Sequence, residues 1–258
     1  MTPPKLQGKT ALITGGSKGL GKAMAVALAQ EGASLALVSR DRGNLESVAA
    51  EAKKAANAAG SDCDARVFVA DVSREADVAR LGTEVAAAFP RVDILINNAG
   101  INIRKNLVDF TLDEWSSVQN TNVTAVFLMC RTFIPLMKGA GYGRILNMTS
   151  IMSHVSMPMR TAYSTSKAAL LGMTKALALE LAADGITVNG ISPGPFATEM
   201  NLPLLQNEEL NRQFVSKIPL GRWGKVEEIG QLAAFLCSPD AGFITGTDIL
   251  IDGGWCAQ

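Results

Sequence analysis

Thr10-Ala-Leu-Ile-Thr14 runs directly into Gly15-Gly16-Ser17-Lys18-Gly19-Leu20-Gly21, and a helical pattern of alanines and leucines then extends to Gln30. An apolar run, a glycine-rich turn and a helix in this order predict a strand joined tightly to a helix. At such a joint, backbone N–H groups and the positive end of the helix dipole face the same point, and both favour a pyrophosphate. The spacing G-x3-G-x-G differs from the common G-x-G-x-x-G fingerprint, and the glycines alone are also compatible with a purely structural turn.

The alternation of short apolar runs with longer helical patterns continues to the end of the chain. Further strands are expected at residues 34–39, 66–70, 92–96, 143–149, 186–191 and 247–251, and further helices at residues 44–59, 75–89, 112–138, 168–183 and 226–236. No linker, repeat or low-complexity segment interrupts the pattern. It predicts one α/β domain over residues 1–258, with a doubly wound parallel sheet of seven strands and helices on both faces.

The composition indicates a folded, soluble chain and argues against several classes of partner. Of its 258 residues, 48% are hydrophobic and 19% are charged, so a sizeable core is expected. Because 24 basic residues balance 24 acidic ones, we expect neither nucleic acid nor an anionic membrane as a partner. The four cysteines are scattered without metal-ligand spacing, which predicts no metal site and reduced thiols. With no signal-like stretch and no run of about 20 apolar residues, a cytoplasmic location is expected.

The end of the second predicted strand bears on which nucleotide would bind. In dinucleotide-binding folds, an acidic residue at this position binds the adenosine ribose hydroxyls and selects NAD. Here the position holds Ser39, followed by Arg40, and Lys18 lies in the glycine-rich turn across from it. Two cations and a hydroxyl suit a 2′-phosphate, so NADP(H) is favoured while NAD(H) stays possible. We interpret Asp41 as the N-cap of the next helix; the alternative is that Arg40 and Lys18 are solvated surface charges.

Tyr163-Ser164-Thr165-Ser166-Lys167 opens the helical segment that includes residues 168–183. Residues four apart share one face of a helix, so the phenol of Tyr163 and the ammonium of Lys167 can act on the same substrate atom. A nearby ammonium favours the phenolate, and moving the phenol pKa from about 10 to about 7 needs roughly 4 kcal/mol. The pair therefore predicts a tyrosine of lowered pKa that exchanges a proton with a substrate. The alternative is two unrelated residues sharing a helix by chance.

Two asparagine-containing stretches also lie where they can serve a site. Asn97-Asn98-Ala99-Gly100 follows a predicted strand at its carboxyl end, where open sheets bind ligands, although a structural turn has the same composition. Asn122 lies in the middle of the predicted helix 112–138, where its side chain competes for backbone hydrogen bonds. We expect Asn122 either to bend this helix or to expose a carbonyl group for use.

Together these motifs resemble the short-chain dehydrogenases/reductases, and the resemblance covers nearly the whole chain. The motifs that carry it occur in the family's order and spacing: Thr14-Gly15-x3-Gly19-x-Gly21, Asn97-Asn98-Ala99-Gly100, Asn122, Ser150, Tyr163-x3-Lys167, Pro193-Gly194 and Asp252-Gly253-Gly254. The resemblance implies a Rossmann fold, hydride transfer between a ketone and a secondary alcohol, and a homotetramer. The short Tyr-x3-Lys spacing resembles carbonyl reductases rather than enoyl reductases. The branch it resembles most holds 3-oxoacyl-carrier-protein reductases and gluconate 5-dehydrogenases.

The resemblance also implies catalytic roles. Tyr163 would be the general acid in reduction or the base in oxidation, and Lys167 would lower its pKa and bind the nicotinamide ribose. Ser150 would hydrogen-bond the carbonyl oxygen as negative charge develops there. Asn122 would hold a water that links Lys167 to solvent as a proton relay.

Cofactor contacts follow from the same resemblance. Gly15, Ser17, Gly19 and Leu20 are expected at the pyrophosphate, Asp71 and Val72 at the adenine, Asn98 at the adjoining ribose, and Thr198 on the nicotinamide side. The full set expected at the cofactor is Gly15, Ser17, Lys18, Gly19, Leu20, Gly21, Ser39, Arg40, Asp71, Val72, Asn98, Ala99, Gly100, Tyr163, Lys167, Pro193, Gly194 and Thr198.

Three features bear on the substrate, for which a 3-oxoacyl thioester and a keto-sugar acid both stay open. The only histidine, His154, lies close to three methionines, and this group either borders an adaptable apolar pocket or simply packs a loop. A substrate-covering loop is expected at about residues 195–220, and its apolar part is residues 196–205. Three basic residues would suit a carboxylate or phosphate at the mouth of a cleft, and are otherwise solvated. The methionines are Met152, Met157 and Met159, and the basic residues are Arg104, Lys105 and Arg160.

Other assignments compete with these. Residues 100–104 and 219–224 resemble the gluconate type, while an apolar covering loop favours the thioester. The alternative function is a catalytically silent NADP(H)-binding sensor or scaffold, against which the intact set of four catalytic residues argues. A lyase or epimerase could use the same fold, but such relatives tend to carry a separate substrate domain for which this chain leaves no room.

Overall fold

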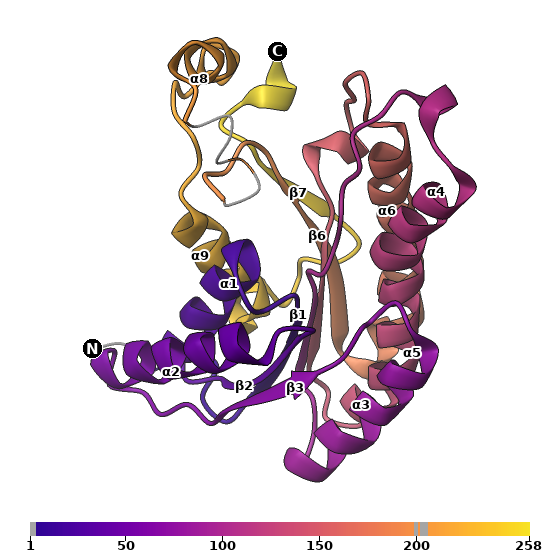
Figure 1. Cartoon of the computed structure of the whole chain (residues 1–258). Coiled ribbons are helices and arrows are strands. Elements are labelled where there is room, and N and C mark those ends of the chain that lie inside the picture. Colours follow the sequence, from indigo (N-terminus) through magenta and orange to yellow (C-terminus); the bar gives the residue numbers. More distant parts are fainter. Residues whose placement is uncertain (1–3, 199–200, 202–205) are drawn as a thin grey trace.

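Seven parallel strands form one sheet at the centre of the protein (Figure 1). The computed structural model describes residues 4–198, 201 and 206–258. The strand order is β3-β2-β1-β4-β5-β6-β7, and every neighbouring pair is parallel. The strands are β1 (Thr10–Thr14), β2 (Ser34–Ser39), β3 (Ala65–Val69), β4 (Ile94–Asn97), β5 (Gly143–Met148), β6 (Ile186–Pro193) and β7 (Asp248–Ile251). The predicted α/β class and doubly wound sheet are confirmed.

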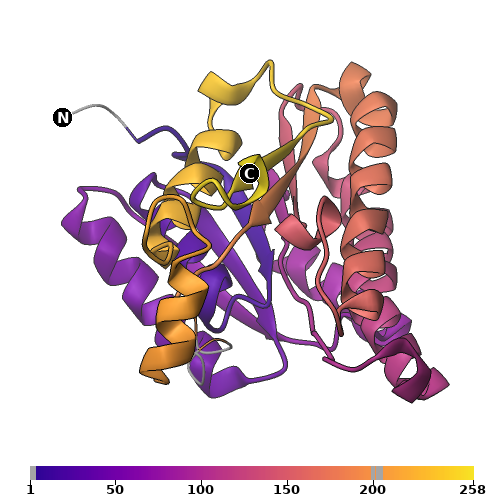
Figure 2. The ribbon, with the colours of Figure 1, turned by 90° about the horizontal axis from the view of Figure 1, so that it is seen from above.

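Helices cover both faces of this sheet. α1, α2 and α9 pack on one face, and α3, α5 and α6 pack on the other, and Figure 2 shows the sheet between the two layers. The helices are α1 (Gly19–Gln30), α2 (Arg42–Ala58), α3 (Glu75–Ala88), α4 (Leu112–Gln119), α5 (Ala125–Met137), α6 (Thr161–Leu181), α8 (Glu208–Val215) and α9 (Val226–Cys237). Within the described part of the chain, none of the helices is long and apolar enough to cross a membrane.

The strands supply apolar side chains to both layers at once. Along β2, Leu35 and Leu37 are buried in the layer that contains α1, α2 and α9. The alternate residues Ala36 and Val38 are buried in the opposite layer. Successive side chains of a strand point to opposite faces of a sheet, so a strand covered on both sides must be apolar throughout. This explains why the strands appear in the sequence as unbroken apolar runs.

The strand order creates a switch point beside β1. This strand pairs with β2 on one side and with β4 on the other, so the connections that follow β1 and β4 lead to opposite faces of the sheet. A crevice opens between such connections at the carboxyl edge of an open α/β sheet. The glycine-rich turn after β1 and the Asn-rich turn after β4 both lie at this edge.

The predicted helix 112–138 is interrupted where Asn122 lies. It consists of α4, a π-helical turn over Asn120–Thr124, and α5. π-Helical turns inside helices often mark functional sites, and here the turn follows from hydrogen bonds that the Asn122 side chain makes outside the helix. The prediction that Asn122 perturbs this helix is therefore correct. The other predicted helices and strands differ from the observed ones mainly at their ends. The largest difference is at α6, which was predicted from residue 168 but begins at Thr161 and so includes the Tyr163–Lys167 pair.

The helix α8 was not predicted. α8 has a polar sequence and no fully buried residue, so it lacks the apolar stripe from which the other helices were inferred. Asn207 caps it by accepting a hydrogen bond from the Leu210 N–H at 3.0 Å. The predicted substrate-covering loop includes residues 199–200 and 202–205, which lie outside the described residues.

Candidate active site

The turn between β1 and α1 leaves backbone donors available to a ligand. Gly15 and Gly19 have φ values of +63° and +55°, which L-residues with side chains rarely adopt. A Cβ on Gly21 would lie 2.3 Å from the Gly15 carbonyl oxygen, so this glycine lets α1 approach the turn closely. No side chain caps the first turn of α1, and this turn contains no acidic residue. Its N–H groups and dipole therefore favour an anion.

Asn98 fixes this turn to the end of β4. Its Nδ2 donates to the carbonyl oxygens of Thr14 at 2.9 Å and Gly15 at 3.1 Å. In return, the Thr14 hydroxyl accepts the N–H groups of Asn98 and Ala99 at 3.0 and 3.1 Å. The Asn-rich turn thus has a structural role. The predicted contact of Asn98 with a ribose stays a prediction.

Arg40 and Asp71 face each other at the ends of β2 and β3. Arg40 Nη1 lies 3.9 Å from Asp71 Oδ2, and its side chain is 76% exposed. The Ser73 N–H and hydroxyl donate to Asp71 Oδ1 at 3.0 and 2.6 Å. Burial raises the pKa of Asp71, but the Ser73 hydrogen bonds and the Arg40 charge outweigh burial and lower the pKa overall. Asp41 caps α2 as predicted, accepting the Asn44 N–H at 3.0 Å.

Asn122 is buried and ties three segments together. Its Nδ2 donates to the Ile101 carbonyl and to the Ser166 hydroxyl, both at 2.9 Å, and its Oδ1 accepts the Ile101 N–H at 2.8 Å. The Ser166 hydroxyl in turn donates to the Tyr163 carbonyl at 2.7 Å. The π-helical turn, the loop after β4 and the start of α6 are therefore fixed relative to one another.

Lys167 carries a buried amine at the same place. Its side chain is 5% exposed, and Nζ donates to the Met148 carbonyl at the end of β5 at 2.6 Å. Burial lowers the pKa of Lys167 to about 8. Nζ lies 5.7 Å from the centre of the Tyr163 ring, one helical turn earlier on α6. The shared helix face predicted for the pair is confirmed.

The pKa of Tyr163 differs from the sequence prediction. Enclosure by the protein raises the pKa of the phenol, while the Ser150 hydroxyl and the charge of Arg160 lower it, and the net shift is upward. The predicted downward shift caused by Lys167 is not observed. Lys167 lies against the ring and donates to a backbone carbonyl. The phenol therefore keeps its proton at neutral pH.

Ser150 lies just beyond β5 and begins a 3-10 turn over Ile151–Ser153. Its Oγ accepts the Met152 N–H at 3.1 Å. Because the oxygen accepts this bond, the hydroxyl proton remains available for a donor role. The Ser150 side chain also lies near enough to Tyr163 to lower the pKa of the phenol.

A single cleft of about 1010 Å³ joins the glycine-rich turn to these polar side chains. All predicted cofactor residues line it except Gly21, which packs behind the turn. Of the predicted catalytic residues, Ser150, Tyr163 and Lys167 line the cleft, whereas Asn122 lies behind Gly100. Sequence reasoning missed Ser117 and Thr121, whose spacing of four on one helix face was the available signal. It also missed Val38, Asn44, Ala70, Ser73, Ile101, Met148, Thr149 and Asn201 as lining residues.

The residues predicted to bear on the substrate have different partners. Lys105 pairs with Glu114. Arg160 is half-buried and close enough to Arg104 and Tyr163 to interact with both electrostatically, and neither arginine has an ion-pair partner among the described residues. His154 is partly exposed, pairs with Asp248 at 2.6 Å and does not line the cleft. Over the same part of the chain, no group of His, Cys, Asp and Glu side chains is arranged to hold a metal ion.

Comparison with known proteins identifies the family. Residues 15–256 match the family model described as enoyl-(acyl carrier protein) reductase. The chain is 36% identical over 250 residues to the 3-oxoacyl-(acyl-carrier-protein) reductase of Thermotoga maritima, covering 97% of this chain and 98% of the relative. It is also 36% identical to the gluconate 5-dehydrogenase of Gluconobacter oxydans, over 96% and 95% of the two chains. The chain belongs to the short-chain dehydrogenase/reductase family.

Solved structures of this family have the same fold. A structure described as a putative NAD(P)-dependent gluconate 5-dehydrogenase from Beutenbergia cavernae with bound NADP superimposes with a TM-score of 0.90 at 35% identity. The match covers 99% of this chain and 100% of that one. The relatives are named as oxidoreductases, and this short-chain dehydrogenase/reductase is an oxidoreductase as expected from its motifs.

The buried amine of Lys167 makes stability depend on pH. Its folded-state pKa of about 8 lies below its ordinary value of 10.5, so between these values only the unfolded chain keeps the proton, and stability rises with pH. We expect Lys167→Met to remove this rise and to increase the free energy of unfolding at pH 7 by up to about 3 kcal/mol. Urea unfolding from pH 7 to pH 10.5 measures both effects.

The matched control for this prediction is Lys175→Met, which removes a lysine from an exposed position of the same helix. This variant should keep the pH dependence of the parent protein. Equal pH dependence in Lys167→Met and the parent would show that burial of the amine does not lower the free energy of unfolding.

Proposed function

We propose that this protein is an NADP(H)-dependent oxidoreductase that interconverts a ketone and a secondary alcohol by hydride transfer. The observation that carries the proposal is the convergence of Ser150, Tyr163 and Lys167 in the same cleft that the glycine-rich turn lines. Hydride transfer needs a dinucleotide site and a proton donor side by side. The chain supplies both in one cleft.

The residues of the turn fit a dinucleotide. The uncapped N-terminus of α1 would hold the pyrophosphate, and the glycines leave room for its close approach. Arg40, with Lys18 and Ser39, would hold a 2′-phosphate, for which the exposed guanidinium needs only to leave its 3.9 Å contact with Asp71. The bound nicotinamide would supply or accept the hydride. The NADP in the Beutenbergia cavernae structure supports this cofactor.

Tyr163 would donate the proton in the direction of reduction. Its raised pKa keeps the phenol protonated at neutral pH, so the donor is present before a ketone arrives. The hydroxyl proton of Ser150 would stabilise the negative charge that develops on the carbonyl oxygen. Lys167 would restore the proton of Tyr163, since a pKa of about 8 lets the amine gain and lose a proton near neutral pH. We propose that Asn122 supports this transfer by holding the loop at Ile101 in place.

We propose a ketone that carries a carboxylate, of the keto-sugar acid class, as the substrate. Neither Arg160 nor Arg104 is in the cleft lining, but Arg160 lies three residues before Tyr163 and close enough to interact with it electrostatically. Burial and the like charge of Arg104 lower the pKa of Arg160. Two arginines without an acidic partner in the described residues are unfavourable so close together, and an anionic group on the substrate would offset their repulsion. A 3-oxoacyl thioester has no charge near its ketone, so this observation favours the gluconate-type relatives over the 3-oxoacyl type.

The test follows nicotinamide absorbance with purified protein, NADPH or NADH, and two ketones. 5-Ketogluconate supplies a carboxylate, and the acetoacetyl thioester of N-acetylcysteamine is neutral. We expect faster oxidation of NADPH than of NADH, and faster turnover of 5-ketogluconate. Tight NADPH binding without turnover on a broad panel of ketones would overturn the proposal in favour of a silent NADP(H)-binding sensor or scaffold.

Cofactor choice should depend on Arg40. Arg40→Ala should lower the preference for NADPH over NADH by roughly 10-fold or more, since a hydrogen bond to a charged group contributes about 1.5–3 kcal/mol. The ratio of kcat/KM values for the two cofactors measures this preference. Arg42→Ala is the matched control, because Arg42 pairs with Glu46 on the exposed side of α2. An unchanged ratio in Arg40→Ala would contradict the assignment of Arg40 to a 2′-phosphate site.

Substrate choice should depend on Arg160. Arg160→Gln should raise the KM for 5-ketogluconate by roughly 10- to 100-fold, because the carboxylate loses a charged partner. The KM for the neutral thioester should change little, and this comparison within one variant controls for damage to the site. Equal effects on both ketones would mean that Arg160 does not bind the carboxylate.

We also propose that the protein is a homotetramer. Large apolar side chains are exposed on α4 and α5 at Leu112 and Phe127, and on the edge strand β7 at Leu250. Two separate self-complementary faces would build a closed tetramer. Light scattering should give a tetramer for the parent protein and a dimer for Leu250→Lys. A monomeric parent protein would contradict the proposal.

A further inference from the structure

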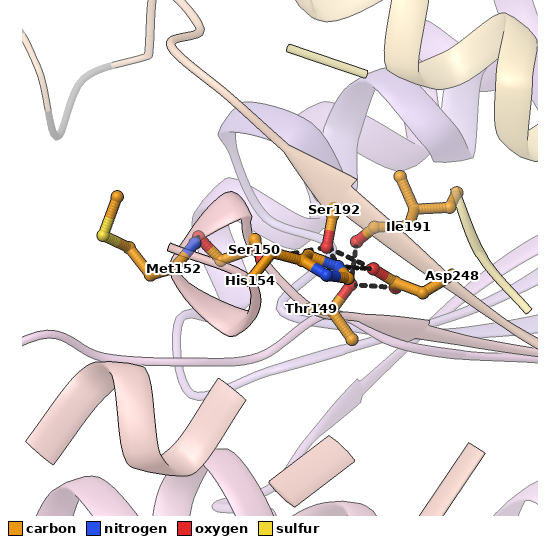
Figure 3. A network of polar contacts seen from close by, with 7 residues as sticks. All are labelled: Thr149, Ser150, Met152, His154, Ile191, Ser192 and Asp248. Atoms are coloured by element: carbon orange, nitrogen blue, oxygen red, sulfur yellow. Dashed lines mark hydrogen bonds and ion pairs between the residues drawn. The ribbon is translucent and has the colours of Figure 1, made fainter. Parts of the chain in front are cut away.

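Asp248 places a buried carboxylate next to the segment that carries Ser150. It is the first residue of β7, and its side chain is 8% exposed. Three side chains surround it (Figure 3). The Thr149 hydroxyl lies 2.5 Å from Oδ1, and the Ser192 hydroxyl and His154 Nε2 each lie 2.6 Å from Oδ2.

The protons of these groups are available to the carboxylate. The Thr149 hydroxyl also lies 2.6 Å from the Ile191 carbonyl, and the Ser192 hydroxyl lies 2.9 Å from the Ser150 carbonyl. Both carbonyls already accept backbone N–H groups, from Thr149 at 2.9 Å and from Ser153 at 2.8 Å. The two hydroxyls and the imidazole can therefore all donate to Asp248, which satisfies a buried charge that would otherwise be costly.

The opposite strand leaves space for this carboxylate. Gly190 on β6 is the register partner of Asp248 on β7. A Cβ on Gly190 would lie 2.0 Å from Asp248 Oδ1, so any side chain there would displace the carboxylate. The network therefore requires a glycine at position 190 as well as the three donors.

The three donors lie close to Ser150 in the chain or in space. Thr149 precedes it in the chain, and His154 ends the 3-10 turn that Ser150 begins. The Ser192 hydroxyl oxygen on β6 lies 2.9 Å from the Ser150 carbonyl oxygen, while its one proton is donated to Asp248. The Ser150 hydroxyl oxygen is itself held by the Met152 N–H of the same turn. The position of this hydroxyl thus depends on a turn whose two ends are tied to β7 through one carboxylate.

We propose that Asp248 is a positioning residue for Ser150, acting through Thr149, Ser192 and His154. Neither Asp248 nor His154 lines the cleft, so neither touches a substrate there. The carboxylate instead holds the turn so that the Ser150 proton points at the carbonyl oxygen. The inference rests on the proposed function only in that Ser150 donates a hydrogen bond to the carbonyl oxygen of the ketone.

The kinetic test compares Asp248→Asn, His154→Ala and His154→Gln with the parent protein. Asp248→Asn keeps the shape of the side chain and removes its charge, and should lower kcat by about 10- to 100-fold, since small misplacements of catalytic groups have effects of this size. The KM for the ketone and the Kd for NADPH should stay within about twofold of the parent values, because binding does not need the Ser150 proton. His154→Ala should lower kcat less, and His154→Gln, which keeps an N–H donor, should recover most of it.

The control variant is Asp240→Asn, which removes an exposed carboxylate that pairs with Lys5 and does not line the cleft. It should leave kcat unchanged. A fall in thermal stability of Asp248→Asn and His154→Ala without any fall in kcat would overturn the proposal, because the network would then be only structural.

Amide hydrogen exchange gives a readout that needs no turnover. In Asp248→Asn and His154→Ala, the Met152 N–H should exchange at least about 10-fold faster, while amides in the middle of β5 and β6 keep their rates. Unchanged protection at Met152 would overturn the proposal. If the parent protein turned over no ketone, the proposed function would fail, and the exchange result would still decide whether Asp248 holds the turn.

Discussion

The buried amine of Lys167 is the constraint on which the arrangement of the site depends. A side chain that is 5% exposed must find a partner within the protein, and the Met148 carbonyl at the end of β5 provides it at 2.6 Å. The turn after β4 lies against the amine. A Cβ on Gly100 would make an ordinary contact with Nζ at 3.5 Å and a tight one with Asn122 Oδ1 at 3.2 Å. The turn after β4, the end of β5 and α6 thus all contact this one cationic group.

Hydrogen bonds within the protein hold the site while leaving its reactive protons unused. Asn98 and Thr14 join the ends of β1 and β4, so the N–H groups of the glycine-rich turn need not hold the turn together. Asn122 fixes the loop and α6 in the same way at the other end of the cleft. The first turn of α1 then faces the cleft without a side-chain cap, which is the preorganisation that electrostatic catalysis requires.

The parts of this arrangement that could be predicted from sequence are local. The strand, turn and helix around Gly15–Gly21 and the face shared by Tyr163 and Lys167 follow from residues that are close in the chain. The π-helical turn at Asn122 could not be predicted in detail, because it depends on hydrogen bonds to residues 21 and 44 positions away. The pair of His154 and Asp248 spans 94 positions, and nothing in the local sequence of either residue announces the other.

The raised pKa of Tyr163 could not be predicted from local sequence either. The spacing of four places Tyr163 and Lys167 on one helix face, but it does not reveal how deeply they are buried or which group accepts a hydrogen bond from Lys167. Burial acts on both groups, raising the pKa of the phenol and lowering that of the amine. At neutral pH the phenol and the amine therefore both carry their protons, so the pair is set up as a proton donor.

The most direct test of this account is a single-turnover measurement on Tyr163→Phe with NADPH and 5-ketogluconate. The account predicts NADPH affinity within about twofold of the parent protein, and hydride transfer at least about 100-fold slower, because the substitution removes the proton and little else. Hydride transfer at the parent rate in a well-folded Tyr163→Phe protein would contradict the assignment of Tyr163 as the acid and, with it, the central claim.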